Sequence, residues 1–398
     1  MAKKQKPEGE SEITNDLFTM ISKGIGAEIL DDRDKTLWTC IDTGILALNY
    51  ALSGKFVGGG VPGGTVMETF GGSSSGKTLF GTNLLRGTQT ANGIAAMLDA
   101  EQTLSKDFAV KASHVDPKKF IVFTADTLEN AFNRIHKLIR QVRQEAKVPL
   151  ERPLVIVYDS IAVSPSEREF AETELDMETV SKAAMKEAGA GSDKPGERAK
   201  ICSKELRKLP KILADNNTTI LFINQTRQKI GVMYGDPTTT AGGGTSLEFY
   251  CTLRLKLQGS KHIKDKSGKV IGINVNLKCI KNKTFRPFTE VRSVRLFFDK
   301  GIDPFGGLLE LLLQEQRIEA VKPAGTYKVC EPYSGGEEIT FKSNKERNDV
   351  PADILLKCPA LVDATDPSQV QYYCDMFGSA LSAVENDIGV EEDIQNEE

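Results

Sequence analysis

The stretch Gly71-Gly72-Ser73-Ser74-Ser75-Gly76-Lys77-Thr78 decides the fold of this chain, because it fits the spacing G-x-x-x-x-G-K-[ST] of a phosphate-binding loop. Residues 65–70 before it are rich in apolar and β-branched residues and predict a strand. The spacing of Leu84, Leu85 and Thr88 after it predicts a helix over residues 79–91. A strand, a glycine-rich turn and a helix form the context that a phosphate site needs. A chance Gly/Ser-rich loop that happens to contain Lys-Thr is therefore the weaker interpretation.

The residue types of this loop explain how it would hold a nucleotide. Small residues let successive backbone N–H groups surround the β- and γ-phosphates, and the N-terminus of the following helix adds partial positive charge. Lys77 adds a mobile full charge, and the hydroxyl of Thr78 is a ligand that suits Mg²⁺. The predicted nucleotide-binding residues of the loop are Gly71, Gly72, Ser73, Ser74, Ser75, Gly76, Lys77, Thr78 and Leu79.

The composition limits the class of protein. With 398 residues and a hydrophobic content of 39%, the chain is long enough for two or three folding units around a substantial core. It contains no stretch of about 18 apolar residues, and no apolar run follows the basic N-terminus, so neither a membrane span nor a secretory signal is expected. The seven cysteines include no C-x-x-C pair, which favours reduced thiols in a cytoplasmic protein and argues against a zinc site. The net charge of −4 does not itself indicate a nucleic-acid-binding protein, but local charge matters more than the total.

The order of the predicted elements indicates an α/β fold. Besides the strand and helix around the loop, apolar strands are predicted at residues 95–98, 120–123, 154–157 and 219–223, and helices at 46–52, 106–113, 128–142 and 197–213. Strands that are apolar along their whole length are typical of a mostly parallel sheet covered on both faces. Three further strands, at 250–257, 271–280 and 291–298, are expected as antiparallel additions to this sheet.

The chain divides into four expected parts. Residues 1–42 form a tail, a helix and a linker, and the helix carries an apolar stripe of Ile13, Leu17, Ile21 and Ile25. This stripe either packs on the chain's own core or docks on a neighbouring subunit. Residues 43–315 form the nucleotide-binding core, 316–384 a small C-terminal domain, and 385–398 a disordered tail with seven acidic residues and no basic one.

Polar side chains follow the predicted strands at the points where they end. In open α/β sheets, ligands bind at the carboxyl ends of the strands. Asp159 is placed to hold Mg²⁺, Glu101 to orient and deprotonate an attacking water, and Gln225 to sense a γ-phosphate. Each acid alone is equally well read as a helix cap or a surface charge. Their joint placement at successive strand ends favours hydrolysis of a nucleoside triphosphate.

Two segments carry candidate contacts to a polyanion. The predicted helix 197–213 has a basic stripe of Lys200, Lys204, Arg207 and Lys211, which is either a solvated face or a track for phosphates. The glycine- and threonine-rich loop that follows Gln225 carries Arg227 and Lys229. Such a loop is suited to follow a nucleic-acid strand.

These residues resemble the bacterial RecA-type strand-exchange recombinases and their bacteriophage counterparts, over roughly residues 43–312. Residues 71–78 resemble the family's phosphate loop, 98–101 its catalytic-glutamate strand and 157–160 its Walker B strand. The most specific similarity runs from 222–225 through 229–235, 237–240 and 242–243, and corresponds to the family's second DNA-binding loop. The insert 164–195 is longer than the family's first DNA loop, residues 244–246 are additional, and the C-terminal region shows no clear match.

The resemblance implies a RecA-like P-loop NTPase core that uses ATP and Mg²⁺, with Thr78 and Asp159 as metal ligands and Phe108 stacked on adenine. It implies catalytic roles for Lys77, Glu101 and Gln225, and for Lys281 and Lys283, which would reach the ATP of a neighbouring subunit. The residues that would contact DNA are Lys200, Arg207, Arg227, Lys229, Ile230, Gly231, Val232, Gly242 and Gly243.

The activity implied is that of a DNA-dependent ATPase that forms helical filaments on single-stranded DNA and exchanges strands with a homologous duplex. The expected partners are single-stranded DNA, double-stranded DNA, further copies of the chain, a single-strand-binding protein and a loading mediator. The expected location is the cytoplasm of a bacterium, or of the host of a phage. The alternatives are a related P-loop DNA motor such as a hexameric helicase, which the loop after Gln225 disfavours, and a recombination mediator without turnover, which Glu101 disfavours.

Overall fold

The computed structural model describes residues 15–27, 38–171, 196–228, 238–240, 245–343, 349–377 and 388–393. The chain forms two compact units, Met1–Trp38 and Thr39–Glu398, and the second contains almost all of the secondary structure. Among the described residues, no helix has both the length and the apolar character needed to cross a bilayer.

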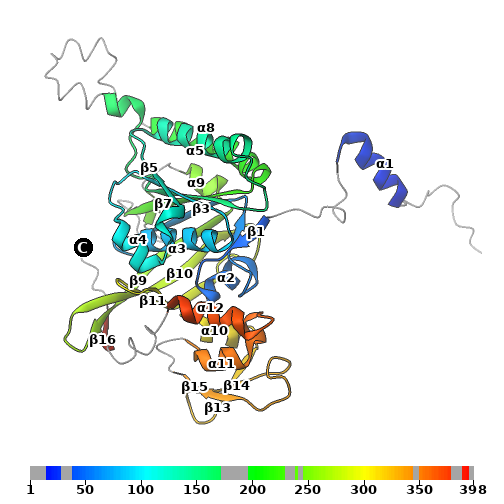
Figure 1. Cartoon of the computed structure of the whole chain (residues 1–398), viewed down its shortest axis with the longest axis vertical. Coiled ribbons are helices and arrows are strands. Elements are labelled where there is room, and N and C mark those ends of the chain that lie inside the picture. Colours follow the sequence, from blue (N-terminus) through cyan, green and yellow to red (C-terminus); the bar gives the residue numbers. More distant parts are fainter. Residues whose placement is uncertain are drawn as a thin grey trace, which may run out of the picture. The chain divides into compact units, whose positions relative to one another are not determined.

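The second unit is built on an 11-stranded mixed sheet with the strand order β12-β11-β10-β9-β3-β7-β6-β4-β5, and β16 and β8 pair at its side (Figure 1). The segment from β9 to β5 is parallel throughout. This arrangement confirms the predicted α/β fold with a mostly parallel centre. The parallel strands that follow β9 in this order are β3 (Val66–Gly71), β7 (Thr218–Gln228), β6 (Leu154–Asp159), β4 (Ile94–Asp99) and β5 (Phe120–Phe123).

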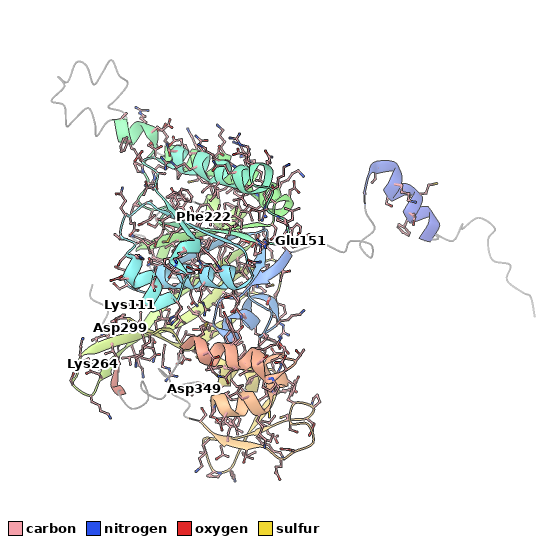
Figure 2. The ribbon with its side chains drawn as sticks, viewed as in Figure 1. Lys111, Glu151, Phe222, Lys264, Asp299 and Asp349 are labelled. Carbon is pink, nitrogen blue, oxygen red and sulfur yellow. The ribbon has the colours of Figure 1, made fainter. Side chains whose placement is uncertain are left out.

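Both faces of the parallel sheet are buried. On β6, Val155 and Val157 belong to one hydrophobic cluster, whereas Ile156 and Tyr158 belong to another, as expected for side chains that alternate across a strand. The first cluster includes apolar residues of α3 (Lys77–Thr90), and the second includes those of α5 (Leu128–Arg140) and α8 (Glu197–Asp215). Figure 2 shows Phe222 of β7 on the side of the sheet that α5 and α8 cover.

The helices form where the sequence pattern predicts them. In α5, the hydroxyl of Thr127 accepts the Asn130 N–H and caps the first turn. A turn with π-helical hydrogen bonds, Gln141–Glu145, continues α5 to the end of the predicted segment. In α8, the apolar stripe of Cys202, Leu206, Leu209 and Leu213 is fully buried. The helix α4 (Lys106–Ser113) begins at Ser105, whose hydroxyl accepts the Phe108 N–H.

The later strands differ in part from the prediction. Residues 246–250 form a short helix, α9 (Ser246–Tyr250), and β9 (Leu253–Asp265) begins only after it. β9 joins β3 in parallel, so the expectation of three antiparallel additions is wrong for this junction. The reason is that α9 returns the chain to the edge of the sheet at which β3 begins. There the Thr252 N–H donates to the carbonyl oxygen of Val66 at 2.8 Å. Beyond β9 in the strand order, β10 (Val270–Asn282), β11 (Glu290–Phe297) and β12 (Gly301–Ile302) add in antiparallel fashion.

Part of the acidic tail is a strand, contrary to the expected disorder. Ile388–Asp393 forms β16 and pairs antiparallel with residues 261–265 of β9. β3 pairs only with residues 253–257 of β9, which leaves the far half of this edge for another strand.

The C-terminal residues pack on the nucleotide-binding core through a shared apolar cluster. Tyr327, Leu355 and Leu361 belong to the same cluster as Leu46 and Leu48 of α2. The elements of this region are α10 (Leu308–Gln314), β13 (Ile318–Val321), β14 (Thr326–Val329), β15 (Thr340–Lys342), α11 (Ala352–Lys357) and α12 (Pro367–Phe377). Short elements near the start of the chain are β1 (Trp38–Ile41), α2 (Leu46–Ser53) and β2 (Val61–Gly63).

The first unit contains the predicted amphipathic helix as α1 (Asn15–Ile25). Phe18, Ile21 and Ile25 are exposed by 53%, 50% and 76%. Ile13, the first residue of the predicted stripe, lies outside the described residues.

Candidate nucleotide-binding site

The loop between β3 and α3 has the geometry of a phosphate cradle. A Cβ at Gly71 would lie 2.2 Å from the Leu257 carbonyl oxygen, so β9 approaches too closely for any side chain there. Gly76 has φ +87°, a left-handed conformation, and a Cβ there would meet Leu296 at 2.3 Å. Both glycines are therefore required for the loop to turn sharply into the N-terminus of α3.

Lys77 folds over this loop. Its ammonium donates to the carbonyl oxygen of Gly71 at 3.1 Å and to that of Gly72. Burial lowers the pKa of Lys77, and the carboxylates of Asp159 and Glu101 oppose that effect. The charge therefore lies where phosphate oxygens would approach the loop.

Thr78 and Asp159 form the candidate metal site. The Thr78 hydroxyl donates to Oδ2 of Asp159 at 2.6 Å. Burial raises the pKa of Asp159 to about 6, the Thr78 hydrogen bond opposes this, and the carboxylates of Glu101 and Asp99 add to it. A hydroxyl and a buried carboxylate without a full counter-charge fit the all-oxygen coordination that Mg²⁺ prefers. These residues therefore fit the metal that the sequence predicts.

Glu101 lies between two hydrogen-bond donors from neighbouring strands. Its Oε1 accepts from the Ser160 hydroxyl at 2.5 Å and from the Gln225 amide at 3.4 Å. Glu101 and Ser160 follow β4 and β6, and Gln225 lies in the last part of β7; the three strands are adjacent and parallel, so their carboxyl ends meet. Asp99 instead accepts backbone N–H groups of residues 103 and 104, so it stabilises the turn after β4.

A pocket of about 290 Å³ collects the predicted residues. It is lined by residues 73–79, Glu101, Phe108, Asp159 and Gln225, and Gly71 and Gly72 lie at the start of the loop outside the lining. A larger cavity of about 420 Å³ beside Asp299 and Lys300 contains none of these groups.

Sequence reasoning missed one wall of this pocket. Leu296 and Phe298, at the end of β11, and Ile273 of β10 line it opposite the polar residues. Phe298 is 48% exposed, although it is a large aromatic residue. The sequence signal for this wall was the alternation of Leu296 and Phe298 about the buried Phe297. Nothing near these residues in the sequence relates β11 to the phosphate loop.

Lys281 and Lys283 are not part of this pocket. In the sheet, Lys281 of β10 lies opposite Arg254 of β9, and Arg254 lies opposite Glu68, near the beginning of β3. The phosphate loop instead follows the end of β3. The Lys281 ammonium donates to the carbonyl oxygens of residues 248 and 249, at the C-terminus of α9, at 2.5 and 3.0 Å. Burial, and then the charge of Lys283, lower the pKa of Lys281.

The candidate DNA contacts are described only in part. Lys200 and Arg207 are exposed on α8, and the Arg207 Nε donates to the Tyr250 hydroxyl at 3.4 Å. Arg227 lies in β7, where its backbone pairs with Thr239 of β8 (Thr238–Thr240). The remaining predicted contacts lie outside the described residues: Lys229, Ile230, Gly231, Val232, Gly242 and Gly243.

The chain is similar to proteins of known family along most of its length. A family model described as the RecA N-terminal domain matches residues 16–303. Protein RecA of Thermus aquaticus is 34% identical over 329 residues, which are 82% of this chain and 87% of that protein. Protein RecA of Mycoplasma mycoides is 33% identical over 309 residues, 77% of this chain and 79% of that protein. Protein RecA of Trichodesmium erythraeum is 34% identical over 298 residues, 75% of this chain and 72% of that protein. The family match spans the phosphate loop, the strand ends around Glu101 and the α8 segment, and with these relatives it shows that this chain belongs to the RecA family.

Proposed function

We propose that this protein is a DNA-dependent ATPase that forms helical filaments on single-stranded DNA and catalyses homologous pairing and strand exchange with double-stranded DNA. The observation that carries the proposal is the position of Gln225. Its side chain lines the nucleotide pocket and donates to Glu101, and its strand β7 continues toward the loop at 229–237. A residue in that position physically connects the nucleotide pocket with the segment that would contact DNA.

The residues of the pocket have distinct roles in hydrolysis. The loop amides and Lys77 bind the phosphates of ATP, and Phe108 packs against the base. Thr78 and Asp159 would hold Mg²⁺, which neutralises charge on the phosphates when it is bound. Glu101 orients and deprotonates the attacking water, and the Ser160 hydroxyl fixes the position of its carboxylate.

The proposed DNA binding depends on positively charged side chains and is independent of the base sequence. Lys200 and Arg207 lie on the exposed face of α8, and they would contact phosphates, which are alike along any strand. Residues 227–243 would follow the same strand. This mode of binding suits a protein that must cover single-stranded DNA of every sequence.

Self-assembly completes the proposal. The apolar side chains of α1 are exposed, and the edge strand β5 exposes Ile121 and Val122 by 42% and 49%. These surfaces differ from each other, so a contact between them would be heterologous. A heterologous contact that does not close into a ring generates a helix, which is the geometry that this proposal requires.

The test compares Lys77→Ala and Glu101→Gln with the wild type in ATP hydrolysis, with and without single-stranded DNA. Lys77→Ala should lose nucleotide binding and filaments. Glu101→Gln should bind ATP, lose turnover by about a hundredfold or more, and form long-lived filaments under the electron microscope. Strand exchange by the wild type is expected. Duplex unwinding without strand exchange would indicate a motor, and filaments without any hydrolysis would indicate a mediator.

A further inference from the structure

A buried carboxylate joins three neighbouring strands beneath the nucleotide pocket. Glu68 of β3 is fully buried. Its Oε2 accepts from Nε of Arg254 on β9 at 2.6 Å, and its Oε1 accepts from the Asn224 amide on β7 at 2.9 Å. The sheet order β9-β3-β7 places Glu68 between its two partners.

Burial alone does not explain this group. A parallel strand covered on both faces folds well with apolar side chains, and β3 otherwise contributes Val66, Met67 and Phe70 to the buried core. Replacing a buried ion pair by apolar residues is often neutral or stabilising. The cluster of Glu68, Arg254 and Asn224 is therefore better explained by a role in orienting neighbouring side chains.

The contacts of Asn224 supply that role. Because its amide nitrogen donates to Glu68, its Oδ1 is turned toward the backbone N–H of Gln225, which it accepts at 2.9 Å. The Gln225 side chain then donates to Glu101 at 3.4 Å. A continuous series of polar contacts thus runs from Arg254 through Glu68 to the candidate catalytic base.

A second branch reaches the helix that follows the loop. Nη1 of Arg254 lies 3.2 Å from a carboxylate oxygen of Glu248 in α9. β7 ends at Gln228 and α9 begins at Ser246, so Glu68 is tied to the elements on both sides of the segment 229–245. A displacement of either element would change the hydrogen bonds of the same carboxylate.

We propose that Glu68 and Asn224 are positioning residues that hold Gln225 in register with Glu101 and relate that register to the elements flanking the DNA-binding segment. The inference rests on the proposed ATPase function. Neither residue lines the nucleotide pocket. Their loss should therefore reduce kcat and its stimulation by DNA, and leave the binding of ATP unchanged.

The main variant is Asn224→Ser, which removes the amide's hydrogen bonds to Glu68 and to the Gln225 N–H and leaves the Glu68–Arg254 pair intact. We expect kcat with single-stranded DNA to fall about tenfold or more, as for a misplaced catalytic group, and KM for ATP to change less than about twofold. Amide hydrogen exchange at Gln225 should accelerate, because its N–H loses the Asn224 acceptor. In a Gln225→Ala background, Asn224→Ser should cause no further loss of kcat, whereas any loss of thermal stability should persist.

Thr69→Val is the matched control, because the buried Thr69 hydroxyl on the same strand has no hydrogen-bond partner. It should keep the wild-type kcat. Glu68→Gln is a second variant, expected to lower kcat and to destabilise the fold by removing the buried negative charge that pairs with Arg254. An unchanged kcat in Asn224→Ser, or an equal loss with and without Gln225, would overturn this inference alone. A wild-type protein that never hydrolyses ATP would overturn the proposed function and the inference with it.

Discussion

At the scale of one residue, Asp159 shows how a side chain suited to metal binding lowers the stability of the folded protein. It is 5% exposed, and its carboxylate accepts a hydrogen bond from the Thr78 hydroxyl. Its pKa of about 6 lies above the ordinary value of 3.8, because burial disfavours the charged form. The same buried negative charge makes the carboxylate a strong ligand for a cation.

Asp159→Asn should therefore stabilise the nucleotide-free protein and abolish Mg²⁺-dependent ATP binding. A pKa change of one unit corresponds to about 1.4 kcal/mol, so the ionised carboxylate costs the fold up to about 3 kcal/mol at neutral pH. Because the folded pKa is the higher one, this cost appears as pH rises from about 4 to 6 and is absent below that range. Chemical denaturation at pH 4.5 and 7.5 measures it.

The exposed acid Asp215, which pairs with Lys211 on the surface, provides the control. Asp215→Asn should change the free energy of unfolding by less than about 1 kcal/mol at either pH. An Asp159→Asn variant that is less stable than the wild type at pH 7.5, or that binds Mg-ATP normally, would contradict the assignment.

At the scale of an element, one face of α8 packs against the rest of the protein, and the opposite face carries exposed basic residues. Its apolar stripe is buried against α5 and the sheet, and Lys200, Lys204 and Arg207 are exposed on the other face. Two further basic residues of this helix are engaged in surface ion pairs, Lys208 with Glu205 and Lys211 with Asp215. The basic face can therefore be altered without disturbing the core.

The double variant Lys200→Ala/Arg207→Ala should weaken binding to single-stranded DNA of every sequence. Each lost phosphate contact should reduce the slope of log K against log salt by about 0.7. Fluorescence anisotropy over a range of salt concentrations measures both effects. Lys111→Ala is the control for the loss of a positive charge elsewhere on the surface, because Lys111 lies on α4, away from α8 (Figure 2). An unchanged slope in the double variant would show that α8 does not contact DNA.

At the scale of the whole molecule, the sheet carries candidate catalytic groups at opposite ends. The phosphate loop follows the carboxyl end of β3. Lys281 and Lys283 lie at the other end, where the Lys283 N–H donates to the Thr252 carbonyl at 3.1 Å. Two ammonium groups so placed can act on the nucleotide of another subunit, as an arginine finger does. An exposed basic strand end that limits aggregation is the alternative.

Lys281→Ala/Lys283→Ala should impair DNA-stimulated hydrolysis and cooperative assembly, while nucleotide binding by the monomer survives. Mixing this variant with Glu101→Ala protomers is the decisive measurement. At a junction, one protomer would supply Glu101 and its neighbour the lysines, so hydrolysis should recover in part. If the two variants demonstrably co-assemble and no hydrolysis returns at any ratio, the lysines do not act across the interface.

The residues that the sequence by itself determined are those whose chemistry is local. The phosphate loop needs small residues and one lysine in succession, and Glu101, Asp159 and Gln225 lie close after apolar runs in the sequence, so pattern and spacing make them candidates. The apolar stripe of α8 was equally readable, because a helix repeats its buried face every three to four residues.

Only the tertiary structure decided which distant segments meet. The parallel pairing of β9 with β3, the pairing of β16 with β9 and the apolar wall with Phe298 all join segments far apart in sequence. Glu68 gives the clearest case, because its partners Asn224 and Arg254 follow it by 156 and 186 residues. A charged residue within an apolar strand carries no local sign of its partner, since the order of strands in a sheet is set by packing over the whole chain.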